Sequence, residues 1–239
     1  MLLLISSLLL MSCGADKYMK KGEKFLALGE YYDAAYQFKQ AYTRTPVKER
    51  DTRGKRALKM AQCYQRINAT PKAIAAYRNA IRYNQASKED QLAYARQLLK
   101  NGDYRQAEKV FLMLKDSMPG NQLIANGLKS AQMAPEWKKQ GSRYIVKRMD
   151  VFNSRRHDYS PVLFGDDYDQ LYFTSTRNEA LGDELSGITG TKAGDIFLSE
   201  KDDRGKWSKP EAIGTGLNTD YDEGACCFTP DGREMYLTQ

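Results

Sequence analysis

A pattern that recurs three times within residues 16–119 is the feature that most constrains how this chain folds. In each copy a small residue, an aromatic residue and a second small or apolar residue stand four and then three positions apart. That spacing places all three on one face of a helix. Successive copies lie 39 and then 34 residues apart, and the five extra residues fall in the charged segment Val47–Arg53. The three triplets are Ala34, Phe38 and Ala41; Ala73, Tyr77 and Ala80; and Ala107, Phe111 and Leu114.

Each triplet is preceded by a second helical pattern, which has a small residue followed three positions later by an apolar one. These pairs are Gly22 and Phe25, Ala61 and Tyr64, and Ala95 and Leu98. The organisation resembles the tetratricopeptide repeat (TPR), a helix–turn–helix of 34 residues whose small residues lie where the helices cross closely. The resemblance implies an α-solenoid over residues 13–133. Its last helix, Asn121–Met133, is expected to cap the final apolar face.

In solenoids of this kind the first helix of each repeat forms most of the concave face. A functional groove there would hydrogen-bond an extended segment or a carboxylate of a partner protein, whereas the alternative is that its polar side chains are simply solvated. Cys63, on the same helices, is interpreted as a small core residue. The candidate groove residues are Glu23, Gln62, Gln65, Arg66, Arg96 and Lys100.

After a predicted linker at 134–149, which begins where Pro135 interrupts the helical pattern, a second repeat of a different type occupies residues 150–239. Segment 158–164 aligns with 222–228, and segment 171–174 with 235–238, both at an offset of 64. Each copy reads as a short strand, an acidic turn and an aromatic strand. Asp-Gly in the second turn is a strong hairpin signal.

Two further elements lie between these hairpins: a strand at 195–199 and an edge element at 205–210 marked by Trp207. Four strands are the content of one β-propeller blade, and the Pro-Asp-Gly and Tyr-Phe-Thr-Ser sequences resemble WD40-like (PD40) repeats. The resemblance implies the first blade or blades of a propeller. Because propellers have about four to eight blades, we expect this chain to be an N-terminal fragment, with completion by another chain as the alternative.

The N-terminus carries an apolar run, Leu2–Met11, which is about half the roughly 20 residues of a membrane-spanning helix. We interpret residues 1–12 as a secretory signal peptide. The sequence Leu10-Met11-Ser12-Cys13 resembles a bacterial lipobox, which implies a lipid on Cys13. The absence of an acidic run after Cys13 favours a periplasm-facing anchor, and a buried N-terminal helix is the alternative.

Composition argues against catalysis. The chain has one histidine and four cysteines, with no disulfide framework and no paired zinc-ligand spacing. We therefore predict no enzyme, no cofactor and no metal site, and interpret His157 as structural, the carboxylates of segment 165–169 as solvated turn residues, and Cys226 and Cys227 as buried thiols.

Charge is divided unevenly along the chain. Lys and Arg outnumber Asp and Glu by 28 to 12 in residues 14–148, whereas Asp and Glu outnumber Lys and Arg by 18 to 9 in residues 149–239. A basic surface favours acidic partners, although secretion makes nucleic acid a poor candidate.

A lipobox, then TPRs, then PD40 blades is the order found in PorE-type lipoproteins of Gram-negative bacteria. The resemblance implies a periplasmic interaction scaffold anchored in the outer membrane, which takes part in a cell-envelope assembly such as the type IX secretion system. In that family the propeller precedes an OmpA-like domain, so peptidoglycan is a partner only if such a domain follows. Two alternatives remain: a TolB-like adaptor of an envelope-tethering complex, and the N-terminal part of a propeller-containing peptidase.

Overall fold

The computed structural model describes the backbone of residues 2–214 and 216–239, and the side chains from Gly14 onward apart from residue 215. The chain divides into two compact units. The helical unit extends to Arg143 and includes the tripeptide 187–189, and the sheet unit comprises the remainder of residues 144–239. The division after Arg143 falls inside the predicted linker at 134–149.

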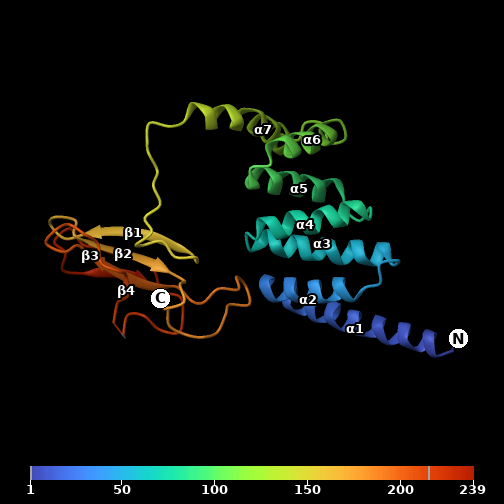
Figure 1. Ribbon diagram of the computed structural model, residues 1–239, viewed down its shortest axis with the longest axis horizontal. Coiled ribbons are helices and arrows are strands. Elements are labelled where there is room, and N and C mark those ends of the chain that lie inside the picture. The colour runs from blue at the N-terminus through green and yellow to red at the C-terminus, as the bar shows by residue number, and fades with distance from the viewer. Residues whose placement is uncertain (1, 215) are drawn as a thin grey trace. The chain divides into compact units, whose positions relative to one another are not determined.

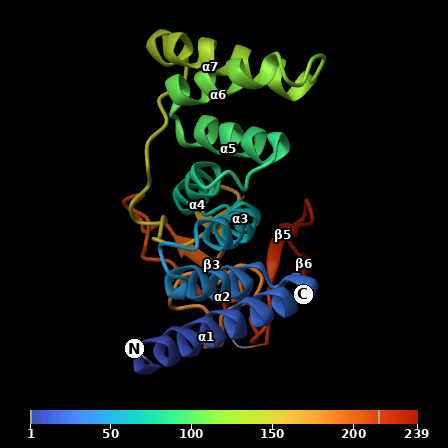
Figure 2. The same cartoon turned by 90° about the vertical axis from the view of Figure 1, so that its right-hand side faces the viewer.

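The helical unit is a succession of hairpins in which each helix packs on the next (Figures 1 and 2). Of the helical residues that the structure describes, no run is both long and apolar enough to cross a bilayer. The seven helices are α1 (Leu2–Ala27), α2 (Tyr31–Arg44), α3 (Arg50–Arg66), α4 (Thr70–Arg82), α5 (Lys88–Asn101), α6 (Tyr104–Lys115) and α7 (Gln122–Gln140).

The turn inside each hairpin repeats the same backbone device. Gly29, Asn68 and Gly102 occupy equivalent positions of the three sequence copies, and all three adopt positive φ angles of 78°, 57° and 83°. Left-handed backbone is favourable for glycine and tolerable for asparagine, and it reverses the chain after a helix. The recurrence confirms the repeat unit at the level of the backbone.

All nine residues of the three predicted triplets are buried, with at most 2% of any side chain exposed. They form one continuous hydrophobic cluster that runs through the hairpins. Burial of the same three positions in every copy is what a stacked repeat requires, because each hairpin covers its apolar face only with its neighbours. The helical unit is therefore a TPR-like solenoid, as predicted.

Two glycines let helices approach closely by accommodating an aromatic ring. A Cβ atom added to Gly22 would lie 2.6 Å from the Phe38 ring, and one added to Gly127 would likewise overlap the ring of Phe111. Both rings are completely buried, so neither has space into which to move. Gly127, on the helix that follows the third repeat, thus reproduces the contact made by Gly22 in the first.

We expect Gly22→Ala to destabilise the solenoid by about 1–3 kcal/mol, the usual cost of overpacking a core. Gly14→Ala in the same helix is the matched control, because a Cβ there meets nothing within 4 Å. That control should stabilise the protein by about 0.5–1 kcal/mol through helix propensity. Chemical denaturation followed by helical circular dichroism measures both, and an unchanged or raised midpoint for Gly22→Ala would refute the close contact.

The capping helix is longer than the sequence predicted. It does not stop at Met133 but passes through Pro135 and ends at Gln140. Proline removes one backbone N–H, but this end of α7 is exposed, so water can bond the freed carbonyl. Gly141, with a φ of 70°, then terminates the helix and donates its N–H to the Trp137 carbonyl at 3.1 Å.

The sheet unit contains a four-stranded antiparallel sheet with strand order β1-β2-β3-β4, and a separate hairpin, β5-β6 (Figure 1). Five of the six strands coincide with predicted ones. The element marked by Trp207 forms only an isolated bridge to Lys201, and β4 begins after Pro210, which has no N–H to donate to a ladder. The strands are β1 (Asp158–Phe164), β2 (Gln170–Ser175), β3 (Asp195–Glu200), β4 (Glu211–Ala212), β5 (Gly224–Phe228) and β6 (Met235–Thr238).

The β5-β6 hairpin repeats β1-β2, but its first strand is displaced by one residue from the sequence alignment. Ser160 in β1 and Ala225 in β5 both have left-handed φ angles, 52° and 45°, and the pairing register shifts at each. These equivalent bulges are 65 residues apart, whereas the partner strands keep the offset of 64. The loop of the second hairpin is therefore one residue shorter.

The same correction identifies the conserved geometry at the start of each hairpin. Ser154 donates its backbone N–H and its hydroxyl to the carboxylate of Asp158, at 2.6 and 3.0 Å. Thr219 donates the same two groups to Glu223, the N–H at 2.9 Å. The structural counterpart of Asp158 is thus Glu223, not Asp222 as the sequence alignment placed it.

The adjacent cysteines Cys226 and Cys227 are both unpaired thiols, but only one of them is buried. Cys226 is 5% exposed, whereas Cys227 is exposed, which corrects the expectation that both are internal. Successive side chains of a strand point to opposite faces, and here only one face of β5 is covered.

Candidate functional site

The first helices of the three repeats line a pocket of about 390 Å³ on the solenoid. Helices α1, α3 and α5 all contribute to it, as expected for the concave face, and residues from the start of α2 and from α4 complete its wall. The lining residues are Leu26, Tyr31, Gln62, Cys63, Gln65, Arg66, Tyr77, Asp90 and Ala93.

Three of the six candidate groove residues come together in this pocket: Gln62, Gln65 and Arg66. They lie on α3 with spacings of three and four residues, which place side chains on one helix face. Because α3 is the central helix of the three that line the pocket, its polar face forms the middle of the site.

The other three candidates do not line the pocket. Glu23 on α1 forms an ion pair with Lys59 of α3 at 3.2 Å, and the Lys100 ammonium group donates to the Asn68 side-chain oxygen at 2.6 Å. Arg96 is exposed on α5, outside the pocket wall. The periodicity assigned these residues to the correct class of helix but did not fix their rotation toward the pocket.

A buried tyrosine fixes one side of the polar surface. The Tyr77 hydroxyl donates to Gln65 Oε1 at 2.6 Å, and only 1% of Tyr77 is exposed. Burial, followed by the nearby charge of Asp90, raises the pKa of Tyr77 well above its ordinary value. The hydroxyl therefore remains a protonated donor and holds the Gln65 side chain in one orientation.

Asp90 fixes the opposite side. It forms a reciprocal capping box with Ser87, in which each side chain accepts from the other's backbone N–H, at 3.0 and 3.2 Å. Its other carboxylate oxygen, Oδ1, accepts from Gln62 Nε2 at 3.1 Å. Sequence analysis did not select Asp90, although Ser-x-x-Asp before a helix is the pattern of a capping box.

Arg66 is the cation of the site. It is exposed, and its guanidinium lies 5.8 Å from the centre of the Tyr31 ring. A planar guanidinium can bond a carboxylate with two parallel hydrogen bonds. The pocket thus combines amide groups held by the protein with one accessible cation and aromatic surface.

Cys63 in the pocket wall is a buried core residue, as predicted, with 1% of it exposed. Burial raises the pKa of its thiol to about 11, and the neighbouring Lys59 offsets part of that rise. The thiolate is the reactive form of cysteine, so this side chain contributes packing rather than nucleophilic chemistry. Within the described residues, no cluster of three or more His, Cys, Asp or Glu side chains is arranged to hold a metal ion.

No family model matches the chain, and no curated protein matches it. Among solved structures, the chain is similar to the C-terminal TPR-containing domain of a Plasmodium falciparum protein described as FK506-binding, with 15% sequence identity and a TM-score of 0.45. The similarity covers 55% of this chain and 94% of that domain.

Proposed function

We propose that this protein is a non-catalytic scaffold whose solenoid holds an extended segment of a partner protein. The observation that carries the proposal is the pocket on the first helices of the repeats, where Gln62 and Gln65 are held by Asp90 and Tyr77. Side chains fixed before binding lose less conformational entropy when a ligand binds. A TPR-like solenoid is also a fold in which stacked repeats create extended concave binding surfaces.

The chemistry of the pocket suits a peptide that carries a carboxylate. An extended segment exposes backbone N–H and C=O groups that the glutamine amides on α3 can bond. Arg66 can pair with a side-chain or terminal carboxylate of that segment. Tyr31, next to Arg66, offers an aromatic surface for an apolar side chain of the ligand.

We further propose that the scaffold is a lipoprotein anchored in the outer membrane and facing the periplasm. The support is the sequence Leu10-Met11-Ser12-Cys13, which resembles a lipobox, at the end of an apolar segment. The side chain of Cys13 lies outside the described residues. More than one acyl chain on this residue would provide stable anchoring, since each buried methylene contributes about 0.8 kcal/mol.

We expect radiolabelled palmitate to be incorporated into the protein when it is produced in a Gram-negative bacterium, and to be lost on Cys13→Ala. Cys63→Ala is the matched control, because that thiol is buried in the solenoid, and it should retain the label. Absence of label from the unaltered protein would refute the anchor while leaving the peptide-binding proposal intact.

The sheet unit is proposed to be the first blade of a PD40-type propeller, followed by the first hairpin of the next. Its support is the repeated hairpin, with equivalent bulges at Ser160 and Ala225. Apolar side chains of the strands also remain open to solvent: Tyr159 is 43% exposed, Leu163 51% and Tyr236 58%. Neighbouring blades would cover such surfaces.

We assign the scaffold to a cell-envelope assembly of the type IX secretion class. The order of lipobox, TPR-like solenoid and PD40-type strands supports this assignment by analogy. If it is correct, the lipid-anchored protein will co-purify with other envelope subunits of that machine after crosslinking in intact cells. Recovery of the protein alone, from cells in which the machine is present, would contradict the assignment.

A further inference from the structure

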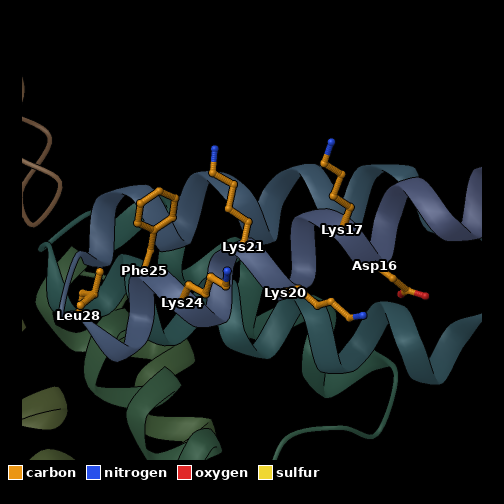
Figure 3. A pocket seen from close by; sticks show the side chains of 7 residues that line it. All are labelled: Asp16, Lys17, Lys20, Lys21, Lys24, Phe25 and Leu28. Atoms are coloured by element: carbon orange, nitrogen blue, oxygen red, sulfur yellow. The ribbon is translucent and has the colours of Figure 1, made fainter.

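Helix α1 carries four lysines along one side: Lys17, Lys20, Lys21 and Lys24, which we term the lysine stripe. All four are exposed, and their side chains extend from α1 into solvent in Figure 3. At about 100° per residue they fall within an arc of about 100° around the helix. The opposite side of α1, which includes Ala15 and Gly22, is buried.

The acidic groups of the same helix do not neutralise the stripe. Asp16 forms an ion pair with Arg56, and Glu23 forms one with Lys59 at 3.2 Å, so both carboxylates are paired with cations of α3. Within the part of the chain that the structure describes, no lysine of the stripe forms a salt bridge. The outer face of α1 therefore has a net positive charge.

Apolar groups continue the stripe at its C-terminal end. Leu28 is 71% exposed, and the half-buried Phe25 lies beside Lys21, whose Nζ is 5.5 Å from the centre of its ring (Figure 3). A helix face that combines lysines with a few large apolar side chains is the usual composition of a helix lying at a membrane surface.

The position of the stripe along the chain indicates what it contacts. The backbone of α1 is one continuous helix from Leu2, and residue 13 precedes Lys17 by four positions and Lys24 by eleven. Those intervals are helical repeats, so position 13 continues the line of the stripe. At about 1.5 Å per residue, Lys24 lies about 16 Å along the axis from the residue proposed to carry the lipid.

We propose that the lysine stripe docks α1 on an anionic phospholipid surface. The proposal rests on the proposed lipid anchor for its location, because an acylated residue 13 would bring the stripe to the headgroups. Each lysine near such a surface contributes about 1 kcal/mol, or a factor of about 5 in affinity. The docking would lay the first helix of the solenoid along the membrane and restrict the orientation of the pocket.

The test is flotation of the full chain with two kinds of vesicle: phosphatidylcholine alone, and phosphatidylcholine mixed with phosphatidylglycerol. The wild type should bind the anionic vesicles at least tenfold more tightly, and high salt should remove the difference by screening. Replacing all four stripe lysines with glutamine should remove it at low salt. A control with the same change in charge replaces four exposed lysines elsewhere on the solenoid: Lys55, Lys109, Lys115 and Lys129.

Loss of the anionic preference in the stripe variant, with retention in the control variant, supports the proposal. Equal loss in both variants would overturn it, because overall charge and not the stripe would then govern binding. No preference in the wild type would also overturn it and would make an acidic protein the better occupant. Binding to neutral vesicles reports the apolar N-terminus, and palmitate labelling reports the anchor, so failure of the stripe is distinguishable from failure of the proposed lipoprotein.

Discussion

Asp158→Ala is expected to destabilise the sheet unit by about 3–5 kcal/mol, because it leaves a buried guanidinium without its counter-ion. Arg177 NH2 donates to Asp158 Oδ1 at 2.9 Å, and both side chains are only 8% exposed. The guanidinium also lies 5.0 Å from the ring centre of Phe173 and 4.7 Å from that of Phe197. It therefore has no route to water without disruption of the core of the sheet.

An exposed ion pair in the same unit is the matched control for this prediction. Arg148 and Asp150 are also 2.9 Å apart, but their side chains are 64% and 87% exposed. Exposed pairs contribute at most about 1 kcal/mol, so Asp150→Ala should have little effect. Urea unfolding followed by Trp207 fluorescence, in a Trp137→Phe background, measures both. Similar effects of the two substitutions would show that Asp158 has no special structural role.

The same ion pair gives the sheet a defined pH dependence. Burial acts to raise the pKa of Asp158, but hydrogen bonds from Ser175, Ser154 and Arg177 outweigh it and hold the pKa below the ordinary value of 3.8. A depressed pKa in the folded state means that the stabilisation is complete above the unfolded value and is lost as the pH falls through the folded value. The wild type should therefore lose its advantage over Asp158→Asn below about pH 4.

Phe111→Ala should destabilise the C-terminal part of the solenoid by about 3–5 kcal/mol, the usual cost of removing a buried phenylalanine. The ring is completely buried between α6 and α7, where it contacts the backbone position of Gly127. Because each hairpin of a solenoid contacts only its neighbours, the damage should remain local. Leu112→Ala is the matched control, since Leu112 is the next residue and is 46% exposed.

Hydrogen exchange resolves the location of that effect. In Phe111→Ala the amides of α6 and α7 should exchange faster, while those of α1 and α2 remain close to the wild type. Leu112→Ala should change neither group. Uniform acceleration through all the helices would contradict the stacked-repeat account and indicate a single cooperative core.

The repeat could be predicted from sequence because its signals are local. Small and aromatic residues such as Ala34 and Phe38 recur at helical spacing, and burial of every equivalent position follows from stacking. The end of α7 could not be predicted in the same way, because propensity treats Pro135 as a stop, whereas an exposed helix end tolerates it. The bulge at Ala225 was equally hidden, since an inserted residue changes the register without changing the apolar pattern.

The pocket was only partly predictable. Gln62, Gln65 and Arg66 were found because three neighbouring positions of one helix share a face. Tyr77 and Asp90 were missed because their roles depend on contacts between helices, with Gln65 and Gln62 respectively. Those contacts are set by how the hairpins pack, and single-helix periodicity does not encode them.

The most direct test of the scaffold is site-specific photocrosslinking in intact cells, with benzoylphenylalanine placed at position 62 or at position 78. Gln62 lines the pocket, whereas Arg78 is exposed on α4 and does not. If the pocket holds a partner, a discrete adduct will form from position 62 and not from position 78, and Arg66→Glu will abolish it. Equal adducts from both positions, or none from position 62, would contradict the claim that this protein works by holding a partner in its concave groove.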